Sequence, residues 1–213
     1  MKILIAHQGS RSGENAAELA GRVCRPWTAE VLALDLSSQG FPIEEIARQE
    51  RCDLILVAEE AQDPIRDWLW RCLIQDLVRH APCPILLTKP VSTTVLRKIA
   101  VPVDGSEASF GLVEKLLPFV TDEMTVTLLH CIEDSPSRLV LYPERRARVV
   151  KLHGRLREFV RNHQQFHLEC GPPTQRVPWW LKAHAFDLLA LDSDRWQTLD
   201  LPSDLPLLLF SAI

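Results

Sequence analysis

One carboxylate in the stretch VPVDGSEAS, residues 101–109, has the setting of a ligand-binding group. Asp104 follows a short apolar run and precedes a Gly-Ser turn and a predicted helix. In that position a carboxylate can accept strong hydrogen bonds from a hydroxyl or amine of a ligand. It can also accept N–H bonds from its own turn and cap a helix that we expect to begin near Ala108. We favour capping over ligand contact, because capping requires no other part of a site.

Two further polar residues, His130 and Cys131, close a second apolar run, MTVTLLHCI. In a sheet of parallel strands the carboxyl ends of neighbouring strands lie at one edge, where open α/β folds bind ligands. We therefore expect both residues to lie near Asp104 and the two apolar residues before it. The candidate binding site consists of Pro102, Val103, Asp104, His130 and Cys131.

No other group of residues predicts catalysis or metal binding. His80 lies near Cys83, but a Pro-rich turn separates them and a structural role is favoured. The six cysteines are far apart and include no C-x-x-C pair, so we expect reduced, mostly buried thiols. We recognise no Ser-His-Asp or Cys-His arrangement and no paired acid and base. We predict a protein that is not an enzyme and that holds neither a metal ion nor a cofactor.

The elements that must position these residues occur twice in the chain of 213 residues. The opening KILIAHQGS at 2–10 aligns with KIAVPVDGS at 98–106, which places Gln8 on Asp104. Each opening is followed by a predicted helix and then by matching apolar runs. The helices are expected near 13–24 and 107–119, and the apolar runs at 30–36 and 124–132, 52–58 and 186–192, and 84–88 and 206–210.

Continuous leucine and β-branched runs between helical segments predict strands that are buried on both faces, hence a parallel α/β sheet. We predict two tandem, doubly wound parallel-sheet domains, at 1–90 and 98–213, joined by a linker at 91–97. The closing strands 84–88 and 206–210 should pair with each other, antiparallel, because each would otherwise be a bare apolar sheet edge.

The two predicted domains differ in length. The second contains an extra helix near 145–163 and an extra strand at 166–171, so the first lacks about one βα unit. The second is short between Asp192 and Leu205, where it lacks most of its last helix.

The segments VPVDGSEAS, VTLLHCIE and DLILVA with VRHAPCPILLT resemble the universal stress protein family, here as a tandem pair. The resemblance implies an adenine nucleotide alpha hydrolase-like fold, a role in stress response, and a nucleotide crevice at the carboxyl ends of the strands. Nucleotide-binding members carry a pattern of Gly, two residues, Gly, nine residues, and Gly-Ser or Gly-Thr after the fourth strand. In the first half its four positions fall on Ala58, Ala61, Arg71 and Cys72, so all four are replaced.

The resemblance also implies roles for the candidate site in the second half. Asp104 matches the family's aspartate that contacts adenosine, and His130 and Cys131 stand where members line the adenine pocket. Asp192, however, stands where the first glycine turn would be. We predict a protein that does not bind ATP and acts through protein contacts as a regulatory or scaffold component. The alternative is a sensor of an adenosine- or AMP-like ligand in the second half.

The overall composition fits a cytoplasmic protein without a nucleic-acid or membrane partner. The net charge is −4, and no apolar run approaches the roughly 18 residues of a membrane span. The basic stretch at 144–163 is more typical of a solvated helix face than of a site for an acidic partner. Adjacent Trp179 and Trp180 cannot both face one core, so we expect one of them to be partly exposed or to lie at a domain contact. A homodimer is left open.

Overall fold

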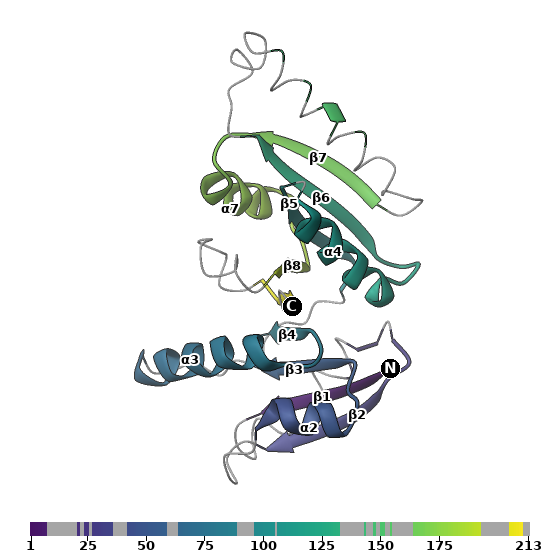
Figure 1. Cartoon of the computed structure of the whole chain (residues 1–213), viewed down its shortest axis with the longest axis vertical. Coiled ribbons are helices and arrows are strands. Elements are labelled where there is room, and N and C mark those ends of the chain that lie inside the picture. The colour runs from purple at the N-terminus through teal and green to yellow at the C-terminus, as the bar shows by residue number, and fades with distance from the viewer. Residues whose placement is uncertain are drawn as a thin grey trace.

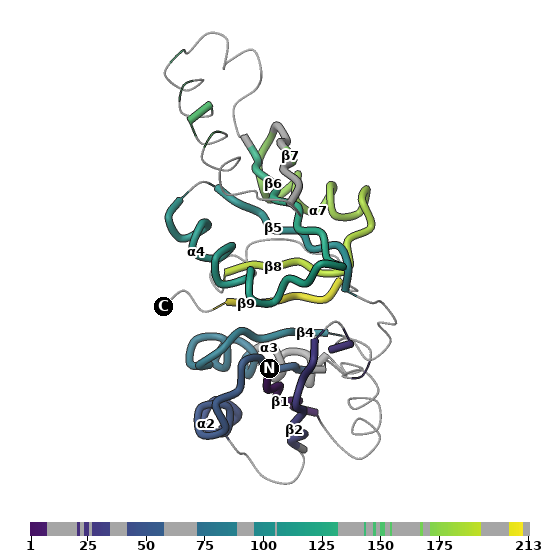
Figure 2. Tube along the Cα trace, turned by 90° about the vertical axis from the view of Figure 1, so that its right-hand side faces the viewer, coloured from purple at the N-terminus to yellow at the C-terminus, as the bar shows by residue number. Residues whose placement is uncertain are grey.

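The computed structural model describes residues 1–7, 24–25, 27–35, 42–58, 64–88, 96–104, 106–132, 164–192 and 205–210, with single positions at 21, 143, 147, 150, 151 and 154. Among them, nine strands form one sheet in the order β2-β1-β3-β4-β9-β8-β5-β6-β7. Figure 2 labels all of these strands except β3, in this order from the bottom of the molecule to the top, with β4 and β9 side by side in the middle.

The described elements follow the predicted apolar runs. The first half contains β1 (Lys2–His7), β2 (Glu30–Asp35), α2 (Ile43–Gln49), β3 (Leu54–Ala58), α3 (Pro64–His80) and β4 (Ile85–Thr88). The second half contains β5 (Lys98–Val103), α4 (Glu107–Leu116), the 3-10 helix η1 (Leu117–Phe119), β6 (Thr125–Ile132), β7 (Gln164–Cys170), α7 (Pro173–His184), β8 (Leu188–Asp192) and β9 (Leu207–Phe210).

The two halves meet at one antiparallel strand pair. All strand pairs within each half are parallel, whereas β4 pairs antiparallel with β9, with Ile85 opposite Leu209. This is the pairing expected from the two closing apolar runs. Because the strand direction reverses there, the carboxyl ends of the strands of one half lie at the edge of the sheet opposite to those of the other half.

The strand order is the same in the two halves except at the outer edge. The order β2-β1-β3-β4 of the first half matches β6-β5-β8-β9 of the second, and β7 adds a fifth strand beside β6. In the part of the chain that the structure describes, no strand lies beside β2 on its outer side. The expected extra strand at 166–171 is thus present as β7.

The inner strands are largely apolar because helices cover both faces of the sheet. Successive side chains alternate between the faces, so Ile3 and Ile5 lie in one core cluster and Leu4 and Ala6 in the other. Helix α4 covers the first face, here called the α4 face. Helices α2, α3 and α7 cover the second, here called the α7 face. Figure 1 shows the two halves stacked along the long axis of the molecule.

A small aromatic cluster adds to the contact between the halves on the α4 face. The indole N–H of Trp27, in the first half, donates to the carbonyl oxygen of Phe119 at 2.8 Å. The rings of Trp27 and Phe119 meet edge to face, with centroids 6.3 Å apart. Phe119 meets Phe210 on β9 in the same way, also at 6.3 Å. The cluster therefore links the end of η1 to the strand that joins the halves.

Several expected features lie outside the described residues. These are most of the helices near 13–24 and 145–163, the interval in which the last helix would be missing, and most of the linker. Leu96, at the end of the expected linker, is buried in the core of the α4 face. None of the described helices combines the length and the apolarity that crossing a lipid bilayer requires.

Candidate functional site

The candidate site lies where β5 and β6 end side by side. Their register places Val103 opposite His130, as expected for the carboxyl ends of neighbouring parallel strands. The ring of His130 is 9% exposed, and its Nδ1 lies 2.8 Å from the carbonyl oxygen of Val103. A carbonyl oxygen can only accept, so Nδ1 carries the proton in this contact. The ring is thereby fixed to the neighbouring strand.

Asp104 is exposed and engaged by its own turn. Its Oδ1 accepts hydrogen bonds from the backbone N–H of Ser106 at 2.9 Å and from the Ser106 hydroxyl at 2.6 Å. The N–H bond is the local contact expected from the sequence, in which the aspartate closes the Gly-Ser turn.

The helix cap is a correction to the sequence-based expectation. Helix α4 begins at Glu107, next to the expected start, but Ser106, not Asp104, is its N-cap. The Oγ of Ser106 accepts the backbone N–H of Ser109 at 3.2 Å. Ser106 has the extended backbone that an N-cap requires and lies three residues before the N–H that it accepts, whereas Asp104 is too far back to reach it.

The five candidate residues gather at one edge, but not on one face of the sheet. Val103 belongs to the core of the α4 face, whereas Cys131 packs against the core of the α7 face. By the alternation of a strand, His130 shares the face of Val103, and Pro102 shares the face of Cys131. His130 and Cys131 therefore do not line one surface together. Asp104 lies beyond the strand end and belongs to neither core.

In the first half, a buried histidine that the sequence analysis did not single out lies at the end of β1, the strand that corresponds to β5. His7 ends β1, is 8% exposed, and lies in register opposite Asp35 of β2. Among the described residues, its Nδ1 has no hydrogen-bond partner. The repeat aligns His7 with Val103, so comparison of the two openings could have found this difference. Gln8, which follows it, lies outside the described residues.

Two of the four positions of the glycine pattern, Arg71 and Cys72, fall within a regular helix. β3 ends at Ala58 and α3 already begins at Pro64, so Arg71 and Cys72 lie in the interior of this helix. Backbone N–H groups inside an α-helix bond to the carbonyl four residues earlier and cannot also surround a phosphate. Ala61 lies outside the described residues.

Other candidate residues have structural surroundings. His80 is the last residue of α3 rather than part of the turn, and its Nδ1 lies 2.9 Å from the carbonyl oxygen of Asp76. Burial raises the pKa of the nearby Cys83 thiol to about 12. Within the described residues, no group of three or more His, Cys, Asp or Glu side chains is placed to hold a metal ion. The adjacent tryptophans separate as expected, with Trp180 2% and Trp179 52% exposed.

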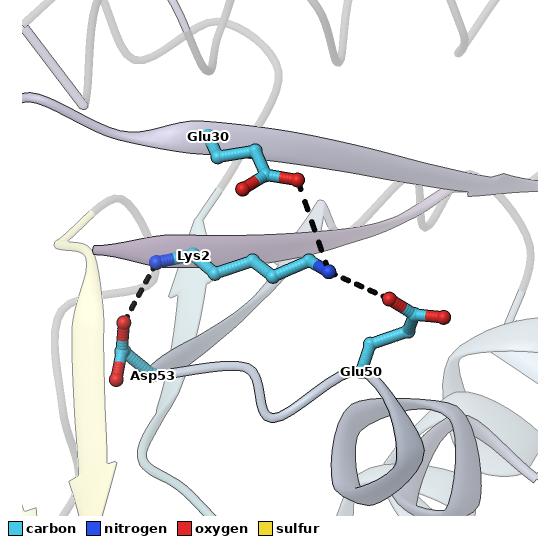
Figure 3. Close-up of polar contacts among 4 residues, drawn as sticks. All are labelled: Lys2, Glu30, Glu50 and Asp53. Carbon is cyan, nitrogen blue, oxygen red and sulfur yellow. Dashed lines mark hydrogen bonds and ion pairs between the residues drawn. The ribbon is translucent and has the colours of Figure 1, made fainter.

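A charged cluster lies at the other end of the first-half strands, away from the carboxyl edge (Figure 3). The ammonium group of Lys2 lies 2.6 Å from a carboxylate oxygen of Glu50 and 3.8 Å from one of Glu30. The backbone N–H of Lys2 donates to Asp53 at 2.7 Å. The hydrogen bond to Glu50 and the surrounding carboxylates raise the pKa of Lys2. These contacts join the starts of β1 and β2 to the segment between α2 and β3.

Comparison with known proteins identifies the fold. A protein assigned as a universal stress protein from Pseudomonas aeruginosa UCBPP-PA14 matches 99% of this chain and 92% of its own length, with a TM-score of 0.62 at 16% identity. A universal stress protein from Archaeoglobus fulgidus DSM 4304 matches 99% of this chain and 96% of its own, with a TM-score of 0.59 at 11% identity.

A protein of unknown function from Pseudomonas aeruginosa PAO1 matches 99% of this chain and 81% of its own, with a TM-score of 0.61 at 17% identity. No protein-family sequence model and no curated protein sequence matches the chain. The chain has the α/β fold of the universal stress proteins.

Proposed function

We propose that this chain is a non-catalytic, cytoplasmic member of the universal stress protein family that does not bind ATP and acts by contact with other proteins. One observation carries the proposal: α3 runs without interruption from Pro64 to His80 through Arg71 and Cys72, where the last glycine of the pattern and its hydroxyl residue would lie. The helix uses the backbone N–H groups that would otherwise hold the phosphates.

Charge at the carboxyl ends of the strands supports the same conclusion. In the second half, β8 ends in the half-buried Asp192, and Ser193 and Asp194 follow it in the sequence. In the first half, Glu59, Glu60 and Asp63 follow β3 in the sequence. Carboxylates near a triphosphate repel it, so they weaken nucleotide binding.

A protein-contact role is supported by the outer surface of α7. Trp179 is 52% exposed, and the guanidinium carbon of Arg176 lies 5.8 Å from the centroid of its ring. Trp and Arg are the residues most enriched among those that dominate protein interfaces. The pair presents apolar area and a cation on a rigid helix, which suits an acidic or amphipathic partner surface.

Thermal unfolding with and without Mg–ATP tests the absence of ATP binding. A dissociation constant of about 10 µM would add about 2.7 kcal/mol at about 1 mM ligand, which would be readily visible as a higher melting temperature. We expect no shift and no release of phosphate. A shift of that size, or steady hydrolysis, would overturn the proposal.

The alternative function, sensing of an adenosine- or AMP-like ligand in the second half, is favoured by one feature, the exposed Asp104 carboxylate at the end of β5. Adenosine and AMP are the probes. If either stabilises the protein, Asp104→Ala should abolish the effect and Gln8→Ala should not. Asp104→Asn, which keeps an acceptor for the turn, separates ligand contact from the roughly 0.5–1.5 kcal/mol that a lost turn hydrogen bond can cost.

Two variants, Trp179→Ala and the control Leu73→Ala, test the proposed role in protein contacts. Proteins cross-linked to the wild type in cell extract are compared with those cross-linked to Trp179→Ala and to Leu73→Ala. Leu73 is 41% exposed but lies on α3, in the other half, so its replacement is the control. We expect a specific cross-linked protein to be lost only with Trp179→Ala. Identical patterns for all three proteins would remove this surface from the proposal.

A further inference from the structure

A cluster of aromatic and imidazole rings lies between the edge strand β7 and helix α7, on the α7 face of the sheet. It contains His167 from β7, Trp180 and His184 from α7, and Phe186 just beyond the helix. Figure 1 shows α7 beside β6 and β7 at the upper end of the molecule. In contrast to the sequence-based expectation of no metal ion, we propose that His167 and His184 form a two-imidazole site for a late first-row divalent metal ion, of which Zn²⁺ and Cu²⁺ are the strongest candidates.

The spacing of the two rings fits a shared metal ion. Their centroids are 5.8 Å apart and their planes are inclined by 53°. A Zn–N bond of about 2.0–2.1 Å places each ring centroid about 3 Å from the metal, so two tetrahedral ligands have centroids about 5 Å apart. His184 is exposed, so a small rotation of its side chain can close the remaining distance.

The orientation of His184 leaves a suitable nitrogen for the metal. Its Nδ1 lies 3.0 Å from the carbonyl oxygen of Trp180, and because that oxygen can only accept, Nδ1 carries the proton. In the neutral ring the lone pair then lies on Nε2. Metal-binding histidines usually have this arrangement, in which the second ring nitrogen donates to a backbone carbonyl and fixes the ring.

His167 is held in place by packing. Its half-buried ring stacks on Trp180, with centroids 5.3 Å apart and an angle of 26° between the planes. Trp180 is itself only 2% exposed and packs against Phe186 at 4.4 Å. One ligand is therefore fixed against the core, while the other can move toward the metal.

The surroundings predict a weak, exchangeable site. The described residues provide no third His, Cys, Asp or Glu side chain for the metal, so water would complete its coordination. Lys182 lies two residues before His184 on the same exposed helix end, and its charge disfavours a bound cation. Late first-row ions have the highest affinity for imidazole, which is why we assign the site to this class.

Calorimetric titration of the full-length protein with Zn²⁺ tests the site, with Cu²⁺ as a second probe. At pH 7.5 we expect one saturable site, which His184→Ala and His167→Phe each weaken by about tenfold or more. Phe keeps the stack on Trp180 and removes the ligand atom.

His80→Ala is the matched control, since His80 has the same ring contact to a carbonyl four residues earlier but lies on another helix. This variant should bind as the wild type does. No saturable binding by the wild type, unchanged affinity in His184→Ala, or a loss confined to His80→Ala would each overturn the proposal. Melting curves of all variants, measured without metal, verify that they are folded.

Discussion

The carboxylate of Asp187 accepts a hydrogen bond from the backbone N–H of Lys98 at 2.9 Å. Asp53 makes the same contact with Lys2 at 2.7 Å in the first half. The backbone reciprocates in both places, because the N–H of each aspartate donates to the carbonyl of the same lysine, at 3.0 and 2.8 Å. A shared side-chain contact of this kind supports an internal repeat more strongly than apolar runs do, since it requires one residue type at one geometric position.

The two aspartates should differ in their contribution to stability. Asp187 accepts a second backbone hydrogen bond, from the N–H of Arg97 at 3.0 Å. For Asp53 the structure gives one such bond, from the N–H of Lys2. We expect Asp187→Ala to lower the free energy of unfolding by about 2 kcal/mol and Asp53→Ala by about 1 kcal/mol. Urea unfolding measures both. Asp187→Asn, which keeps an acceptor oxygen, should recover part of the loss; an equal cost for the two alanine variants would contradict the prediction.

The contact between the halves can be weakened at Trp27. Trp27→Phe keeps a ring beside Phe119 but removes the N–H that donates to its carbonyl at 2.8 Å. We expect a loss of about 1 kcal/mol, the usual net value of a hydrogen bond. Leu208→Ala, on β9 opposite Leu86, should cost about 2–5 kcal/mol because Leu208 is only 1% exposed.

If the halves fold as one unit, both variants should still unfold in a single transition, by fluorescence and by circular dichroism. Separate transitions by the two probes in one variant would show that the halves unfold independently once the contact changed in that variant is weakened.

The sheet could be predicted from the sequence because its signals are local. Buried parallel strands need continuous apolar runs, and each closing run needed a neighbour, which predicted the antiparallel pair of β4 and β9. The sequence could also have predicted that His130 and Cys131 lie on opposite faces of the sheet, since neighbouring residues of a strand alternate between the faces.

The remaining contacts depend on tertiary structure. Trp27 and Phe119 are 92 positions apart, and His167 and His184 lie on a strand and a helix that only packing brings together. The N-cap of α4 was assigned to Asp104 instead of Ser106, because aspartate and serine are both good N-caps and only their order around the turn decides between them.

Cysteine reactivity should follow burial. Burial raises the pKa of Cys24 to about 11 and that of Cys83 to about 12, so in the folded protein both stay protonated well above pH 8. Cys72 is exposed on α3. With iodoacetamide at pH 8, mass spectrometry should find Cys72 alkylated in minutes and the other two only after denaturation. Rapid alkylation of Cys83 in the folded protein would contradict this.

The ion pair of Lys2 with Glu50 predicts a stability difference that depends on pH. Because the hydrogen bond to Glu50 raises the pKa of Lys2 above 10.5 in the folded protein, its contribution is fully present below pH 10.5. It is lost as the pH rises through the folded-state pKa. The difference in melting temperature between wild type and Lys2→Met should therefore be constant between pH 7 and 9 and shrink above 10.5. Glu50→Gln should reduce this pH dependence without abolishing it, because Glu30 still faces the ammonium group. A difference that grew with pH would have the wrong sign.

Ser106 should connect the Asp104 turn to α4, because one hydroxyl serves both. Its Oγ donates to Asp104 at 2.6 Å and accepts the N–H of Ser109 at 3.2 Å. Ser106→Ala should lower the free energy of unfolding by about 0.5–2 kcal/mol, as loss of an N-cap does. Asp104→Ala should cost less in the Ser106→Ala background than in the wild type, because the hydroxyl contact is already gone. A double-mutant cycle by urea unfolding measures this coupling. Strictly additive losses would mean that the aspartate is held by the backbone N–H of Ser106 alone.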